Sequence, residues 1–286
     1  MEKECRGAWG ARSASGTPGT PIARFRLPVT RPGPKVMRTM TKQLSFALAA
    51  SCLLGLTVAG FAQQPRGVSL FNGKDLSGWK VPAGDNGHWK VMDGVIDYDA
   101  ESESTAADKS LWSEKTYGNF TLHVDWRIKE TPYVNPNVPI IRPDGTHKKG
   151  ADGKEIRMSV PDSDSGILLR GTSKAQVNIW CWPIGSGEVY GYRTDEKMPP
   201  AVRAAVTPSK NADHNIGEWN TYDITVRGNR LTVVLNGQTV INAAELPELP
   251  ATGPVGLQHH GAKKGGVWTS PPALVQFRNI SIEELK

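Results

Sequence analysis

Residues 174–182 read KAQVNIWCW, an alternation of small or apolar residues with amides and indoles. Because the side chains of a strand change face at every residue, this run predicts a β-strand with two unlike faces. One face is apolar, and the other carries Gln176, Asn178, Trp180 and Trp182. After a break at 183–187 that contains proline and glycine, the alternation resumes and predicts a second strand of the same kind.

The second strand is expected to present Glu188, Tyr190 and Tyr192 on its polar face. Flat aromatic rings can cover the C–H face of a sugar, and amides or a carboxylate can bond its hydroxyl groups. Residues 174–192 therefore predict a sugar-binding surface. The alternative is an ordinary solvated strand face that carries some amphipathic aromatic residues.

Short alternating runs recur along the rest of the chain, at 120–128, 222–226 and 274–282. A further run at 231–241 contains Asn-Gly between two apolar segments, which predicts a tight hairpin. No long stretch has a 3.6-residue apolar period, and 201–206 predicts a turn or two of helix. The pattern therefore predicts an all-β domain, either a sandwich or a jelly roll, without internal repeats.

The N-terminal part of the chain is expected to lie outside the folded domain. Residues 37–62 combine basic residues, an apolar run at 44–59 and a small-residue cleavage site, which predicts a signal peptide cut after Ala62. Residues 1–36 are rich in Arg, Pro, Gly and Ser and are interpreted as a disordered leader or a mis-assigned start. One domain is then expected over 63–286, in a secreted or periplasmic protein of a bacterium.

Charge and cysteine content exclude several classes of function. The chain has 34 basic and 28 acidic residues, but residues 1–62 hold nine of the basic and two of the acidic ones. The remaining 25 basic and 26 acidic residues give no support for a nucleic acid or an anionic membrane as partner. Cys181 is the single cysteine after Ala62 and is expected to be a buried free thiol. Cys52 as a lipoprotein anchor is the weaker alternative to the signal peptide.

Two segments resist assignment as strands, residues 131–164 and residues 193–218. Both flank the polar strands of 174–192. Long ordered loops in a compact domain commonly serve function, so we interpret these segments as walls or a lid over the site. The alternative is that they are solvated insertions.

Seven short motifs in order resemble one known family, the DUF1080 or 3-keto-disaccharide hydrolase domain. They lie at 70–79, 89–96, 164–167, 218–220, 235–237, 256–261 and 277–282. Together they extend over nearly all of 68–286. At 164–167 this chain has Asp164 where the family motif has Asn, which puts any role of that amide in doubt.

The resemblance implies a concanavalin-like jelly-roll β-sandwich that acts on oxidised sugars. A ketone at sugar C3 acidifies the hydrogen at C2, so a base can remove that proton and the resulting enolate can expel the glycosidic oxygen. Addition of water then completes a net hydrolysis. Such a route needs one base, donors for the developing oxyanion and an acid for the leaving oxygen.

Strand parity supplies the candidates, provided that the strands are neighbours. We expect one concave face to collect the catalytic candidates His260, Glu188, Asp125, Arg127 and Arg170 and the substrate-binding candidates Gln176, Asn178, Trp180, Tyr190 and Gln258. His260 or Glu188 is the expected base, and Arg127 or Arg170 the expected partner of the enolate. A structural ion pair of Asp125 with either arginine is the alternative to catalysis.

No residue is assigned to a metal, because the spacing of the histidines matches no recognised site. Adjacent strand residues face opposite ways, so His259 and His260 are not expected to share one ion. The acidic runs 97–101 and 162–164 leave calcium open as a divalent cofactor, although such runs are more often solvated turns.

Three functions are compatible with these observations. The first is an enzyme that cleaves 3-keto-glycosides, with a small glycoside or an oligosaccharide as substrate and with no membrane span. The second is a non-catalytic, lectin-like carbohydrate-binding module of the same fold. The third is a conventional glycosidase, which ranks last because it needs a pair of carboxyl groups across the site and the 188–192 run supplies one.

Overall fold

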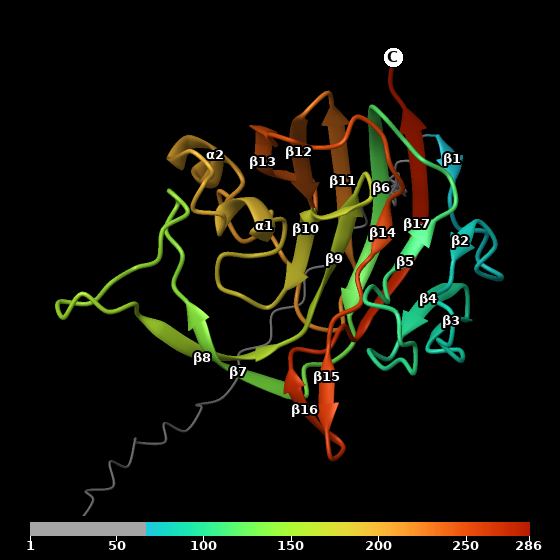
Figure 1. Ribbon diagram of the computed structural model, residues 1–286, viewed down its shortest axis with the longest axis horizontal. Helices are drawn as coiled ribbons and strands as arrows, with labels where there is room; N and C mark the ends of the chain where they lie inside the picture. The colour runs from blue at the N-terminus through green and yellow to red at the C-terminus, as the bar shows by residue number, and fades with distance from the viewer. Residues whose placement is uncertain (1–66) are drawn as a thin grey trace, which may run out of the picture. The chain divides into compact units, whose positions relative to one another are not determined.

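The computed structural model describes residues 67–286 and is shown in Figure 1. The expected leader, the expected signal peptide and its cleavage site at Ala62 lie outside the described residues. Within 67–286, no helix has the length and the apolar character that crossing a membrane requires.

Most of the described chain is built into two antiparallel sheets. The larger sheet has eight strands in the order β13-β12-β11-β6-β17-β4-β3, with β1 paired to β17. Its strands are β1 (Val68–Ser69), β3 (Trp89–Met92), β4 (Val95–Tyr98), β6 (Phe120–Ile128), β11 (Asn220–Arg227), β12 (Arg230–Leu235), β13 (Gln238–Glu245) and β17 (Val275–Glu284).

The smaller sheet has five strands in the order β10-β9-β14-β5-β2. Its strands are β2 (Trp79–Lys80), β5 (Leu111–Ser113), β9 (Asp164–Leu169), β10 (Thr172–Trp180) and β14 (Gly256–Leu257). Two separate hairpins and two short helices complete the fold: β7 (Tyr133–Pro139) with β8 (Arg157–Asp162), β15 (Ala262–Lys264) with β16 (Val267–Ser270), α1 (Tyr190–Arg193) and α2 (Pro200–Ala205).

One apolar core joins the two sheets. It takes Val124 and Phe277 from the larger sheet and Ile167, Val177 and Leu257 from the smaller one, all nearly inaccessible to solvent. Figure 1 shows the strands of the smaller sheet overlapping β11, β6 and β17 of the larger one. The expected all-β sandwich is therefore confirmed, and the alternation of apolar residues along each strand is its cause.

Tight turns fix the register of the hairpins that the sequence indicates. Asn236 and Gly237 connect β12 to β13 with φ of 50° and 75°, the left-handed conformations of a type I′ turn. Leu235 pairs with Gln238 across this turn, in agreement with the hairpin expected at 231–241. The expected short helix at 201–206 is also found, as α2.

Two expectations about local structure are wrong. Residues 188–192 do not form a second polar strand, because Tyr190 opens the single-turn helix α1. Three residues that alternate over five positions do not distinguish a strand from a helical turn. Residues 131–164 were not assigned to strands, but they contain the paired strands β7 and β8.

The smaller sheet turns its outer face toward several covering segments. In Figure 1, α1 lies beside β10, and the β7–β8 and β15–β16 hairpins lie beyond the end of the sheet near β9. Contacts of α1 with β10 and of β16 with β7 link these segments. They enclose the outer face of β10, so the wall role that was expected for part of 131–164 fits this arrangement.

Replacement of Phe277 by Ala tests the shared core. The ring is fully buried and its residue pairs in register with Trp126 and Ile96, so its removal leaves a cavity. We expect the free energy of unfolding in urea to fall by about 3–5 kcal/mol. Thr239→Ala, at an exposed strand position, is the matched control and should change it by less than about 0.5 kcal/mol. Equal, small effects of both changes would contradict the packing described.

Candidate functional site

A cavity of about 430 Å³ lies on the outer face of the smaller sheet. Its lining comes from β10, β9 and the end of β14, and is closed by α1, β7, β8 and the base of the β15–β16 hairpin. The residues that carry polar or aromatic groups into it are Asn135, Asp162, Asp164, Ser173, Gln176, Asn178, Trp180, Trp182, Tyr190, Gln258, His260 and Ser270. All five expected substrate-binding residues and His260 therefore meet in one place.

Three amide side chains form the floor of this cavity. Nε2 of Gln176 lies 2.6 Å from Oε1 of Gln258, 2.7 Å from Oδ1 of Asn178 and 3.1 Å from the carbonyl oxygen of Ser165. Because Gln176 donates, the other two amides accept through oxygen and keep their NH₂ groups for other partners. Neither Asn178 Nδ2 nor Gln258 Nε2 donates to another described residue, so both are available to a ligand.

The glycine of the 164–167 motif makes room for this cluster. A Cβ atom on Gly166 would lie 2.6 Å from the side chain of Gln176 and 2.8 Å from the carbonyl oxygen of Val177. Any larger residue at position 166 would collide with the Gln176 side chain and displace its amide from the cluster. Gly166 thus belongs to the site through the space that it leaves, and not through any group that it carries.

Two stacked indoles form one wall. The rings of Trp180 and Trp182 lie 4.0 Å apart and 6° from parallel. Trp180 Nε1 donates to the carbonyl oxygen of Gly185 at 2.8 Å, and Trp182 Nε1 donates to Asp162 at 3.0 Å. Each ring is therefore held in place by its own hydrogen bond, which gives a rigid aromatic surface for a sugar ring.

His260 is held in one tautomer by a carbonyl group eleven residues further along the chain. Its Nδ1 lies 2.6 Å from the carbonyl oxygen of Pro271, and a carbonyl can only accept, so Nδ1 carries the hydrogen. In the neutral ring Nε2 then has a free lone pair. That nitrogen lies 3.8 Å from Oδ2 of Asp164, too far for a hydrogen bond but close enough for the carboxylate to stabilise a positive charge on the ring.

Asp164 lies at the start of β9 beside His260 and Asp162. Burial raises the pKa of Asp164, the charge on His260 opposes this shift, and the charge on Asp162 adds to it. The net result is a pKa of about 6. Its Oδ1 is buried and has no hydrogen-bond partner among the described residues. A carboxyl group that changes charge near neutral pH beside an imidazole is typical of sites of proton transfer.

Glu188, one of the two expected bases, lies outside the cavity lining. It is fully buried, and its Oε1 accepts a 2.6 Å hydrogen bond from Nε of Arg193. Burial raises the pKa of Glu188 to about 7, although the charge and hydrogen bond of Arg193 oppose the shift. The guanidinium of Arg193 also contacts Nε2 of His147, and Nδ1 of His147 contacts Glu155. Through its bond to Arg193, Glu188 therefore helps to anchor α1 to the segment between β7 and β8.

Arg170 is far from the expected place because β9 ends before it. Arg170 and Gly171 have φ of 49° and 74°, so they form the turn between β9 and β10 and the strand parity no longer applies. Its guanidinium donates to the carbonyl oxygens of Gly118, Gly228 and Pro250 at 2.6–2.9 Å. The buried arginine thus joins three loops.

Asp125 and Arg127 face away from the core as expected, but on the larger sheet. Two packed sheets turn their outer faces in opposite directions, so these residues cannot share the face of β10. Arg127 donates to Gln276 at 2.7 Å and lies over the ring of Trp219. Asp125 accepts from Thr221 and from Asn279 at 2.7 Å. The expectation of one face with all the catalytic candidates is wrong for Asp125, Arg127, Arg170 and Glu188.

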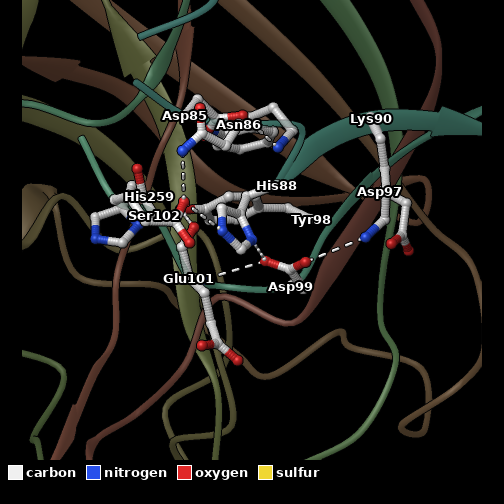
Figure 2. Close-up of polar contacts among 12 residues, drawn as sticks. Asp85, Asn86, His88, Lys90, Asp97, Tyr98, Asp99, Glu101, Ser102 and His259 are labelled. Carbon is white, nitrogen blue, oxygen red and sulfur yellow. Dashed lines mark hydrogen bonds and ion pairs between the residues drawn. The ribbon is translucent and has the colours of Figure 1, made fainter. Parts of the chain in front are cut away.

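The acidic run 97–101, which left calcium open, has protein partners instead. Figure 2 shows Asp99 between His88 and Lys90, at 2.9 Å and 3.1 Å. Asp97 accepts from Lys129 and from Gln276 at 2.8 and 2.7 Å. Among residues 67–286, no three acidic, histidine or cysteine side chains are grouped so as to hold a metal ion.

His259 and His260 have different neighbours, although they follow the end of β14 and do not lie in a strand. Nδ1 of His259 makes a short contact with the hydroxyl of Tyr98, and Figure 2 places the two rings beside each other. Burial lowers the pKa of His259 to about 4, so this ring stays neutral at ordinary pH. Tyr98 stacks on Trp89 at 3.8 Å, which fixes the neighbour of His260 in the protein interior.

Six polar or aromatic contributors to the cavity were not among the site residues expected from the sequence: Asn135, Asp162, Asp164, Ser173, Trp182 and Ser270. Trp182 and Asp164 offered a signal, since Trp182 continues the parity of Trp180 and Asp164 departs from the family motif. Asp162 belonged to the acidic run 162–164. Asn135 offered no signal, because the pairing of β7 with β8 brings it to Asp162, to which it donates a 2.9 Å hydrogen bond.

Comparison with known proteins identifies one family. The model of a 3-keto-alpha-glucoside-1,2-lyase-like domain matches residues 67–283. Two solved proteins of Parabacteroides distasonis, each provisionally named a glycosyl hydrolase, are 22% and 20% identical, with TM-scores of 0.49 and 0.46. The matches cover 77% and 76% of this chain and 84% and 93% of those chains. A carbohydrate-binding module of Bacillus subtilis is 14% identical over 72% of this chain and 96% of its own, with a TM-score of 0.35. No curated protein matches the chain.

The pH dependence of stability tests the state of Glu188. Its pKa is about 7 in the folded chain and near 4.5 when unfolded, so the folded protein binds the extra proton between these values. Stability from this group is full below pH 4.5 and is lost as the pH rises through 7, by about 1–3 kcal/mol. We therefore expect Glu188→Gln to flatten the fall in unfolding free energy between pH 5 and pH 8.

Urea denaturation at pH 5 and at pH 8 measures the fall in unfolding free energy between these two pH values. The matched control is Glu196→Gln, at an exposed position, which should keep the pH dependence of the unchanged protein. Because Gln can still accept from Arg193, the variant should fold. The same fall with pH in Glu188→Gln and in the unchanged protein would show that Glu188 is ionised throughout the range.

Proposed function

The chain belongs to the family of 3-keto-alpha-glucoside-1,2-lyase-like domains, and we propose on that premise that it cleaves 3-keto-glycosides by removing the proton at C2. The observation that carries the proposal is the placement of His260 in the cavity lining, with its Nδ1 bonded to the carbonyl oxygen of Pro271, so that in the neutral ring Nε2 carries the free lone pair. Proton removal next to a ketone needs such a base within reach of the acidic carbon.

The first step transfers the C2 proton to His260. The electron pair of the C–H bond moves toward the ketone and places negative charge on its oxygen. Asn178 Nδ2 and Gln258 Nε2 are the donors that can bind this oxyanion, in place of the arginines expected from the sequence. The carboxylate of Asp164, 3.8 Å from Nε2, stabilises the imidazolium that forms.

The second step breaks the glycosidic bond. The electrons of the enolate form a double bond between C1 and C2, and the leaving oxygen takes the pair of the C1–O bond. His260 returns its proton to that oxygen. Water then adds across the double bond, with hydroxyl at C1 and hydrogen at C2, and the sum of the steps is hydrolysis. The stacked Trp180 and Trp182 orient the sugar during both steps.

A lectin-like binding module remains the second candidate. The observation that favours it is the lining of the cavity, in which no lysine or arginine of the described chain takes part. Amides beside indoles suffice for binding a neutral sugar. The predicted signal peptide at 37–62 supports a secreted or periplasmic setting for either function.

A conventional glycosidase fits less well. That reaction needs an acid and a second carboxylate on opposite sides of the glycosidic bond. The carboxylates of the lining are Asp162 and Asp164, which lie two positions apart in the chain and so on the same side of the cavity. Asp162 is fully buried and accepts from Asn135 and Trp182, so it is not free to act on a sugar.

Replacement of His260 by Gln tests the proposed base. The change keeps a polar side chain of similar size but removes the lone pair of Nε2. We expect kcat for release of the aglycone from a 3-keto-glucoside to fall by about 10²–10⁴-fold. His123→Gln is the matched control, because His123 lies on the larger sheet and pairs with Asp223. It should leave kcat unchanged.

Two other results are decisive. Unchanged turnover in His260→Gln would remove the proposed base. Tight binding of the 3-keto-glucoside by the unchanged protein, without any release of aglycone, would establish the lectin-like alternative.

A further inference from the structure

A second cavity of about 430 Å³ adjoins the first. It is lined by Trp126 and Ile128 of β6, by Val160 and Pro161 of β8, and by the segment 211–216. Trp180 and Trp182 belong to the lining of both cavities, so the stacked indoles form a shared wall. Groups bound in the two cavities would therefore contact the same pair of indoles.

The two cavities differ in chemistry. The first is lined mainly by amide, hydroxyl, carboxylate and imidazole groups. The second has an apolar side, made of three indoles with Ile128, Val160, Pro161 and Ile216, and a polar side, made of Asn211, Asp213, His214, Asn215 and Asn220. An apolar wall of this kind gains most by covering a flat ring with few polar groups, whereas a sugar ring would leave several hydroxyls without partners.

Two buried polar groups of the second cavity have no hydrogen-bond partner among the described residues. One is Nε1 of Trp126, whose side chain is 1% exposed, and the other is Oδ1 of Asp213. The first can only donate and the second can only accept when ionised. A hydroxyl group does both, since its oxygen accepts while its hydrogen donates. A ligand hydroxyl can therefore pair with either group.

A third polar group has a fixed direction. Nδ1 of His214 lies 2.8 Å from the carbonyl oxygen of Trp219, so Nδ1 carries the hydrogen and Nε2 of the neutral ring is an acceptor. Oδ2 of Asp213 is already used, because it accepts from the backbone of Ser186 at 2.8 Å. Asp213 and His214 are thus held in place by bonds to the backbone, as polar groups are in sites that orient a ligand.

We propose that the second cavity binds the aglycone of the glycoside and that this aglycone is a hydroxylated aromatic ring. The inference rests on the proposed function, because it takes the oxidised sugar to occupy the first cavity. The glycosidic bond then lies at the stacked indoles, with His260 on the sugar side. The second cavity selects among 3-keto-glycosides by their leaving groups.

The test uses the full chain and two substrates, the 3-keto forms of 4-hydroxyphenyl glucoside and of methyl glucoside. Ile216→Asp places a charge in the apolar wall at a residue that is 47% exposed, so the variant should fold. We expect KM for the hydroxyphenyl substrate to rise by about tenfold or more, with kcat and the methyl substrate unaffected. Met92→Asp, at a residue 50% exposed on β3, is the matched control and should change neither substrate.

Binding of hydroquinone alone, measured by calorimetry, separates the two proposals because it requires no turnover. Weaker binding of hydroquinone by Ile216→Asp than by Met92→Asp would support the aromatic site even if neither substrate were cleaved. In that case the proposed catalytic function is rejected, while the inference about the aromatic site is kept. Equal hydroquinone binding by both variants would overturn the inference, and so would a rise in KM limited to a 3-keto-disaccharide, which would assign the cavity to a sugar.

Discussion

Strand β10 is buried on both of its faces. The amide groups on its polar face must therefore find hydrogen-bond partners within the protein. Val177 and Ile179 fill the core, while Gln176, Asn178 and Trp180 are at most 7% exposed on the other side. Buried amides are costly unless they are hydrogen-bonded. They meet the requirement by bonding one another, and the direction of those bonds decides which groups remain for a ligand.

The proposed base is also oriented by a hydrogen bond within the protein. His260 follows Gln258 in the chain and precedes the β15–β16 hairpin. Its ring donates to the carbonyl oxygen of Pro271, the residue directly after β16. That bond selects the tautomer, and Asp164 supplies the nearby charge. His260 is thus oriented by a hydrogen bond to the backbone, and Asp164 by its place at the start of β9.

Strand parity anticipated a large part of the cavity because it is a local property. The choice of Gln176, Asn178 and Gln258 needed nothing beyond the alternation of side chains and the neighbourhood of their strands. Arg127 shows the limit of this reasoning, since parity tells whether a side chain faces the core but not which sheet carries it. Arg170 shows another limit, because a left-handed residue at the end of a strand breaks the alternation.

The remaining errors have similar causes. Tyr190 lies in the cavity as expected, but it reaches it from a helical turn and not from a strand. Glu188 was expected to be free, yet burial beside Arg193 gives it a structural partner. A sequence pattern does not contain the pairing of buried charges, which depends on segments distant along the chain. For the same reason, the second cavity between β6, β8 and the 211–216 segment had no sequence signal.

Exchange of the C2 hydrogen measures the central step independently of bond cleavage and hydration. A 3-keto-glucoside whose glycosidic bond is cleaved slowly can be incubated with the protein in D₂O and monitored by proton NMR. If His260 removes that hydrogen, its signal at C2 disappears with the unchanged protein and persists with His260→Ala. Release of aglycone while the C2 hydrogen is fully retained in the sugar product would contradict the account.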